Sequence, residues 1–154
     1  SEGVEVDSPS GLNKEEAKKA AEQTGVKIHG VIDSVHWRDT LSSPDEAIRA
    51  KGLKALISGI EDAKFFGADT LLLVPGVVNK DATYEQYYER SQIEVKKALP
   101  TAEKLGIKIC IETVWNNFIT KPEQLVQYID DFKSPFVIFC NTKTPWGLDN
   151  SSCE

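Results

Sequence analysis

The sequence predicts an α/β fold built on a parallel sheet: a (β/α) barrel of the TIM type, incomplete, with about five strands alternating with four helices. Two observations carry this prediction. Short apolar runs alternate strictly with helical patterns, as in sheets with right-handed crossovers, and three helical patterns end at a glycine that leads into the next apolar run. A complete barrel takes eight strands and about 250 residues, whereas this chain has 154. We therefore expect a partial barrel.

Five segments have the character of buried strands, because β-branched and other apolar residues follow one another in them. In chain order they are residues 4–7, 26–32, 70–74, 107–112 and 136–139. No glycine-rich phosphate-binding pattern follows any of them, which disfavours an open nucleotide-binding sheet.

Four helices are predicted from their first residues. Asn13, Ser43, Thr83 and Thr120 are each followed three residues later by Glu or Gln, the capping-box pattern. Pro44 is expected in the first turn of the second helix. We expect three helices to end at Gly25, Gly67 and Gly106, and Pro100 to kink or split the third helix near Leu99.

Composition narrows the partners. The chain has 18 basic and 24 acidic residues and a net charge of −6, which disfavours nucleic acid and anionic membranes and leaves a small molecule as the expected partner. The three cysteines show no paired spacing, which fits a reducing compartment and predicts a cytoplasmic protein. An export signal upstream of Ser1 stays an open alternative.

Candidate functional residues lie where the predicted strands end, because the ends of parallel strands converge on one mouth. They are Glu5, Asp7, His29, Asp33, His36, Trp37, Asn79, Glu112, Trp115, Asn116 and Asn117. Carboxylates, amides and aromatic faces together suit a polyhydroxylated substrate. We expect His29, in mid-strand, to pack against the fold rather than bind a ligand.

Glu112 is the first candidate for chemistry, as a lone carboxylate at the end of an apolar strand. The structural alternative is a Glu that caps the strand or pairs with a Lys. His36 and Trp37 form a loop pair that can line a pocket. Glu5 is either a mouth residue or a structural group at the barrel floor. A hard divalent cation needs several oxygen ligands, so Glu112 alone cannot hold one.

Four segments together resemble the sugar phosphate isomerase/epimerase proteins that have a xylose-isomerase-like TIM barrel. They are Leu41-Ser-Ser-Pro-Asp-Glu-Ala-Ile-Arg-Ala-Lys-Gly52, Asp69-Thr-Leu-Leu-Leu-Val-Pro-Gly-Val-Val-Asn79, Tyr88-Glu-Arg-Ser91 and Ile111-Glu-Thr-Val-Trp-Asn-Asn-Phe118. The resemblance extends over most of residues 3–137.

The resemblance implies an enzyme that binds Mn²⁺ or Mg²⁺ at the barrel mouth and interconverts ketoses or sugar phosphates by proton transfer through an enediolate. Glu112 matches the family's strand-end Glu, which is both a metal ligand and the proton-transfer residue. His36, Trp37 and Asn116 correspond to pocket-lining positions, and we add Glu5 as a substrate-binding candidate. The expected partner is a small sugar or sugar phosphate.

The resemblance also has a departure. The family follows Ser-Pro-x-Val with a strand that ends in a metal-binding Asp, whereas this chain has Cys140 after Phe139. We therefore expect residues 1–139 to form the partial barrel, residues 140–154 to form an aberrant, poorly ordered tail, and the metal site to be incomplete. The isolated chain is then expected to be inactive.

Two alternatives stay open. One is a non-catalytic fragment that acts as a binding module or self-associates as a homo-oligomer, because a slice of a barrel leaves open strand edges. The other alternative is an apurinic-endonuclease relative, which two histidines and a charge of −6 disfavour.

Overall fold

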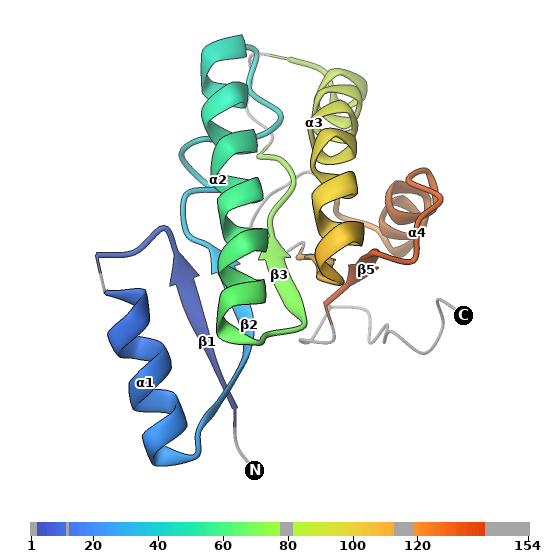
Figure 1. Ribbon diagram of the computed structural model, residues 1–154. Helices are drawn as coiled ribbons and strands as arrows, with labels where there is room; N and C mark the ends of the chain where they lie inside the picture. The colour runs from blue at the N-terminus through green and yellow to red at the C-terminus, as the bar shows by residue number, and fades with distance from the viewer. Residues whose placement is uncertain (1–2, 12, 78–81, 113–118, 141–154) are drawn as a thin grey trace.

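The computed structural model of this chain describes residues 3–11, 13–77, 82–112 and 119–140. These residues form five strands and four helices in strict alternation (Figure 1), as predicted. The strands are β1 (Gly3–Ser8), β2 (Lys27–Asp33), β3 (Thr70–Leu73), β4 (Lys108–Ile111) and β5 (Val137–Phe139). The helices are α1 (Lys14–Thr24), α2 (Glu46–Phe66), α3 (Tyr84–Leu105) and α4 (Pro122–Asp130). None of these helices is long and apolar enough to cross a membrane.

The sheet is parallel throughout and its strands follow one another in chain order, from β1 to β5. All strands therefore end at the same edge, which brings together the residues that follow Ser8, Asp33, Leu73, Ile111 and Phe139. This edge is the expected mouth of the partial barrel.

The helices cover one face of the sheet, and the core lies between the two layers. In β3, β4 and β5 every second residue points toward the helices and is buried there, and Val31 does the same in β2; these residues are Val31, Leu71, Leu73, Ile109, Ile111, Val137 and Phe139. Helices α2 and α3 supply the other half of this core with residues such as Leu56, Ile60, Val95 and Ala98.

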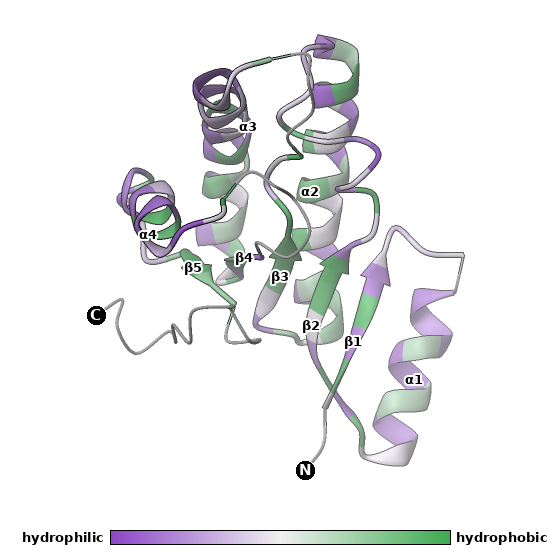
Figure 2. Ribbon diagram, turned by 180° about the vertical axis from the view of Figure 1, so that it is seen from behind, coloured by the Kyte–Doolittle hydropathy of each residue, from purple (hydrophilic) through white to green (hydrophobic). Residues whose placement is uncertain are grey.

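The opposite face of the sheet is called the open face here. Seen from behind, the strands stand in front of the helices that cover their other side (Figure 2). By the alternation of a strand, the open face carries Glu5, Asp7, Gly30, Leu72, Cys110 and Glu112.

Helix starts follow the predicted chemistry with two shifts. Asn13 accepts from the Glu16 amide at 3.1 Å, and Thr83 forms the full capping box with Gln86. The second helix begins at Glu46 rather than near Pro44, because Asp45 takes the cap and accepts from the Ala47 amide at 2.8 Å. The fourth begins at Pro122, where the Gln124 side chain accepts from the backbone amides of both Thr120 and Lys121.

Helix ends also follow the prediction, with one exception. Gly25, Gly67 and Gly106 adopt φ values of 72°, 73° and 70°, the left-handed conformation that glycine reaches without strain. The predicted split at Pro100 is wrong, since α3 continues through this residue to Leu105. Burial of Ala98, Leu99 and Ala102 on both sides of the proline holds the helix together against the lost hydrogen bond.

A glycine on α2 allows the helix to touch the loop after β2. A Cβ on Gly52 would lie 2.3 Å from the backbone oxygen of Asp39, whereas a Cβ on Gly11 would have nothing within 4 Å. We expect Gly52→Ala to lower the free energy of unfolding by about 1–3 kcal/mol, the usual cost of overpacking. Urea denaturation measures this difference, and an equal effect of the control Gly11→Ala would contradict it.

Candidate functional site

Glu112 follows β4 at the mouth edge and is held there by the backbone. Its amide donates to the Leu73 carbonyl at 2.9 Å, which extends the pairing with β3 by one residue beyond the strand. Because Ile109 and Ile111 face the helices, Glu112 faces the open side together with Cys110. The side chain is half-buried. The backbone of Glu112 is therefore fixed in position, and its side chain is still accessible.

The electrostatic surroundings of Glu112 favour its protonated form. Burial raises its pKa above the usual range, and the nearby charge of Glu5 raises it further. The Cys140 thiol feels the same two carboxylates, and its pKa is raised chiefly by burial. Glu112, Glu5 and Cys140 are thus neighbours on the open face.

Glu5 reaches this group although β1 and β4 are not adjacent in the sheet. Gly30 of β2 leaves the necessary space, since a Cβ on Gly30 would lie 3.4 Å from the Glu5 Cγ and 3.0 Å from the Thr70 Oγ1. The Glu5 side chain therefore extends over the backbone of Gly30 toward the middle of the sheet. Glu5 was expected to be either a mouth residue or a structural group at the barrel floor. Its path over Gly30 toward Glu112 on the open face agrees with the first of these.

His36 links the loop after β2 to the end of β3. Its Nδ1 accepts a hydrogen bond from the Val74 amide at 3.0 Å, and the residue is 5% exposed. Burial lowers the pKa of His36 to about 4. The imidazole is therefore neutral near pH 7, and because Nδ1 accepts, the proton is carried by Nε2.

The same loop presents Trp37 to solvent on a rigid base. Trp37 is 45% exposed and meets the ring of His36 edge-on, with 5.5 Å between ring centroids. A second tie to the β3 end comes from Ser42, whose Oγ accepts from the Val77 amide at 3.1 Å. Ser42 therefore supports the position of the loop. The sequence did not reveal this role, because nothing in it distinguishes Ser42 from an ordinary loop serine.

Asp33 is the last residue of β2 and is almost completely buried. One carboxyl oxygen accepts from the Val35 amide at 3.2 Å, and the residue is 1% exposed. Burial raises the pKa of Asp33 to about 7, against the lowering effect of this hydrogen bond and with a further rise from Asp39. Asp33 was one of several candidates at the strand ends, and its burial makes it a support for the loop.

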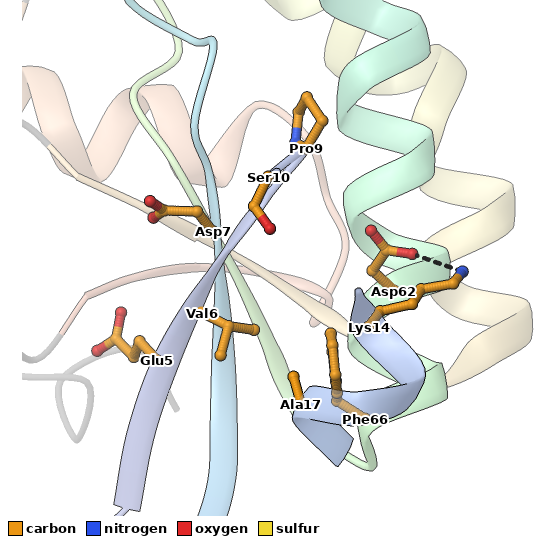
Figure 3. Close-up of a pocket in the computed structure, with 9 residues that line it drawn as sticks. All are labelled: Glu5, Val6, Asp7, Pro9, Ser10, Lys14, Ala17, Asp62 and Phe66. Atoms are coloured by element: carbon orange, nitrogen blue, oxygen red, sulfur yellow. Dashed lines mark hydrogen bonds and ion pairs between the residues drawn. The ribbon is translucent and has the colours of Figure 1, made fainter. Parts of the chain in front are cut away.

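A pocket of about 520 Å³ lies beside β1, and it reaches Pro9 and Ser10 directly after the carboxyl end of this strand. Figure 3 shows Lys14 and Asp62 paired on one side of β1, while Glu5 and Asp7 point to the other side. Val6, Ala17 and Phe66 give the pocket an apolar wall. The pocket therefore shares only Glu5 with the group around Glu112.

The remaining predicted residues are placed less centrally. His29 is exposed, but its ring lies against the backbone of Gly3, a surface contact that agrees with packing against the fold and not with burial in the core. Asn79, Trp115, Asn116 and Asn117 lie outside the described residues, as does all of the predicted tail except Cys140. Cys140 is buried, and its amide donates to the Ile111 carbonyl at 3.1 Å.

A metal site depends on which ligating side chains lie close together in the described ranges. These contain no group of three or more His, Cys, Asp or Glu residues arranged to hold a metal ion. Glu112 and Glu5 could each give one oxygen ligand, but two carboxylates do not complete a site for a hard cation. The described residues alone therefore do not fit a complete metal centre.

Comparison with known sequences identifies the family. The profile of the xylose isomerase-like TIM barrel family matches residues 2–141. The chain belongs to this family. A barrel of this type has a parallel sheet with its helices on one face, and the structure shows the same arrangement.

Individual proteins are similar to this chain at low identity. L-ribulose-5-phosphate 3-epimerase UlaE of Escherichia coli is 27% identical over 106 residues, which make up 69% of this chain and 33% of that protein. A D-tagatose 3-epimerase-like protein superposes with a TM-score of 0.77 at 19% identity, over 90% of this chain and 55% of that one.

Two other solved structures share the fold. An L-ribulose 3-epimerase has a TM-score of 0.73 at 19% identity, over 90% of this chain and 49% of that one. The 3-keto-D-glucoside 4-epimerase YcjR of E. coli has a TM-score of 0.71 at 15% identity, over 82% of this chain and 52% of that one. The chain thus spans a third of the curated relative and about half of these structures.

Replacing His36 tests its hydrogen bond to Val74. We expect His36→Leu to lower the free energy of unfolding by about 1–3 kcal/mol beyond the loss of packing, because the buried Val74 amide loses its acceptor. His36→Asn keeps an acceptor near the Nδ1 position and should lose less. Denaturant unfolding at pH 7.5 compares the two variants, and equal losses would contradict this role.

Asp33 should make stability depend on pH. Its folded pKa of about 7 lies above its ordinary value of 3.8, so the folded state binds the extra proton and the free energy of unfolding falls as pH rises from about 4 to about 7. We expect Asp33→Asn to remove this fall, so that the variant gains on the wild type by roughly 4 kcal/mol between pH 4 and pH 8.

His36 acts in the opposite direction over almost the same range. Its folded pKa lies below the ordinary value of 6.5, so its contribution to stability is lost as pH falls from about 6.5 to about 4. The Asp33 test is therefore made in the presence and absence of His36→Asn. A wild-type profile that Asp33→Asn leaves unchanged in both backgrounds would overturn the assignment.

Proposed function

We propose that this chain carries the proton-transfer carboxylate of a sugar isomerase or epimerase that acts on ketoses or sugar phosphates through an enediolate. The observation that carries the proposal is Glu112: a half-buried carboxylate at the end of a central parallel strand, anchored through its amide and with a raised pKa. Ligands of parallel α/β folds bind at this end of the strands. The sugar epimerases among the family's members support the reaction class.

The chemistry of such a reaction is the removal of a proton from a carbon next to a carbonyl and its return. A carboxylate with a raised pKa is a stronger base than an ordinary one, which suits Glu112 to this step. Glu112 would take the proton on a carboxylate oxygen and hold it until it is returned to the enediolate.

The other predicted residues would bind and orient the sugar. Glu5 would accept hydrogen bonds from hydroxyl groups across the open face, and Asn116 is proposed to bind a hydroxyl group. The exposed face of Trp37 would stack on the C–H groups of the ring. The neutral His36 is a support for this loop and offers its Nε2–H as a donor.

A bound divalent ion, Mn²⁺ or Mg²⁺, would polarise the substrate oxygens and stabilise the negative charge that develops on them. Glu112 is the residue proposed to serve as one of its ligands. The other ligands would have to come from outside the described residues, because these hold no complete set. A chain that lacks those ligands would be inactive on its own, as the sequence led us to expect.

A second candidate function is a non-catalytic module that binds a partner or self-associates as a homo-oligomer. It is favoured by the free outer edges of β1 and β5 within the described sheet. A cytoplasmic location remains a prediction for either function.

Titration of Mn²⁺ by calorimetry tests the metal ligand. We expect Mn²⁺ to bind the wild-type chain only if ligands from outside the described residues complete the site, and we expect Glu112→Gln to weaken that binding at least tenfold, because one charged oxygen ligand is lost. The control Glu123→Gln changes an exposed carboxylate on α4 and should bind like the wild type. Absence of binding in all three proteins would favour the non-catalytic function.

A further inference from the structure

A second pocket lies on the outer side of the helical layer, between the first half of α2 and the middle of α3. Its volume is about 260 Å³. Three basic side chains, two acidic ones and a short apolar wall line it. The pocket therefore has an excess of positive charge on a chain whose net charge is −6.

One of the two acidic side chains is already used within the protein. Glu94 is 6% exposed and binds Lys97 at 3.0 Å, and the Nε of Arg49 lies 3.9 Å from the same carboxylate oxygen. Arg49 also donates from Nη1 to the Ser43 carbonyl at 2.7 Å. The single negative charge of Glu94 is thus shared between Lys97 and Arg49, and it does not also neutralise Arg90.

Arg90 is the third cation of this pocket, and one of its donors is unused. Its Nη1 is buried and has no hydrogen-bond partner within the part of the chain that the structure describes. A buried donor without an acceptor is costly, and more so when it is charged. Because Nη1 is buried, an acceptor group in the pocket would reach it through a movement of the Arg90 side chain, and this movement would give the unused donor a partner.

The remaining wall suits an organic group. Leu53 of α2 and Ile93 of α3 flank the charged side chains, and Ile93 is 46% exposed. The pocket is larger than a single inorganic anion needs, and Arg forms paired hydrogen bonds with planar carboxylates and with phosphates.

We propose that this pocket binds an organic oxyanion, with a carboxylate or phosphate group held by Arg90 and Lys97 and an apolar part against Leu53 and Ile93. The second acidic side chain, Glu46, faces the same pocket and limits it to ligands of low negative charge. This site is separate from the Glu112 group, which lies on the other face of the sheet.

The test uses two probes, inorganic phosphate and butyrate, titrated separately into ¹⁵N-labelled chain at constant ionic strength and without metal. We expect saturable chemical-shift changes at the amides of Ala50, Leu53 and Ile93. Arg90→Gln should weaken binding by tenfold or more, because a charge-assisted hydrogen bond is lost. The control Arg38→Gln removes an exposed arginine outside the pocket and should leave the affinity unchanged.

The outcomes separate the ligand classes and the two sites. Saturation by phosphate or by butyrate identifies the group that the pocket prefers. Shifts that do not saturate with either probe, or an affinity that Arg90→Gln leaves unchanged, would overturn the proposal. Glu112→Gln should bind both probes like the wild type, so a failed metal titration and a failed anion titration are distinguishable. Lys97→Gln gives a second variant, in case Arg90→Gln does not fold.

Discussion

The hydrogen bond from the Val74 amide to His36 Nδ1 is the constraint on which the arrangement at the strand ends depends. It joins the loop after β2 to the end of β3, and Ser42 repeats this link at Val77. Because the bond requires a neutral imidazole, burial and hydrogen bonding stabilise the same protonation state. The loop after β2 is thus tied to the end of β3 at two points, and Trp37 is exposed beside the first of them.

Burial shifts the pKa values of Asp33 and His36, the two ionisable groups near this loop, in opposite directions. It favours the neutral acid at Asp33 and the neutral base at His36. Over the range from about pH 4 to about pH 6.5 the two effects on stability oppose each other, so the folded protein responds less to pH than either group alone would suggest. The acidic side chains on the open face, where a cation or a polyol would meet them, are Glu5, Asp7 and Glu112.

Much of the fold could be predicted from the sequence, because apolar runs, caps and terminal glycines are local signals. The errors came where a local signal was outweighed. Asp45 competed with Ser43 for the cap of α2, and α3 continues through Pro100 because the neighbours of this proline are buried.

The site was less predictable than the fold. Strand-end logic placed Glu112 correctly, but the contact of Glu5 over Gly30 depends on a path between strands that are not adjacent. The pocket around Arg90 depends on two helices whose relative position no sequence period reveals.

Cys140 decides how far the family's chemistry extends to the described residues. The resemblance places a metal-binding Asp at this position, next to the strand that carries Glu112. Here the side chain is a thiol whose pKa is raised by burial, by Cys110 and by the two nearby carboxylates. A protonated thiol is a poor ligand for Mn²⁺ or Mg²⁺, which prefer charged oxygen. The change therefore leaves Glu112, the proposed proton-transfer residue, in place, but it puts a thiol where the resemblance implies an oxygen ligand. A cation bound by Glu112 would have to find its remaining ligands elsewhere, and Glu5, extended over Gly30, is the described carboxylate best placed to replace the one that is missing.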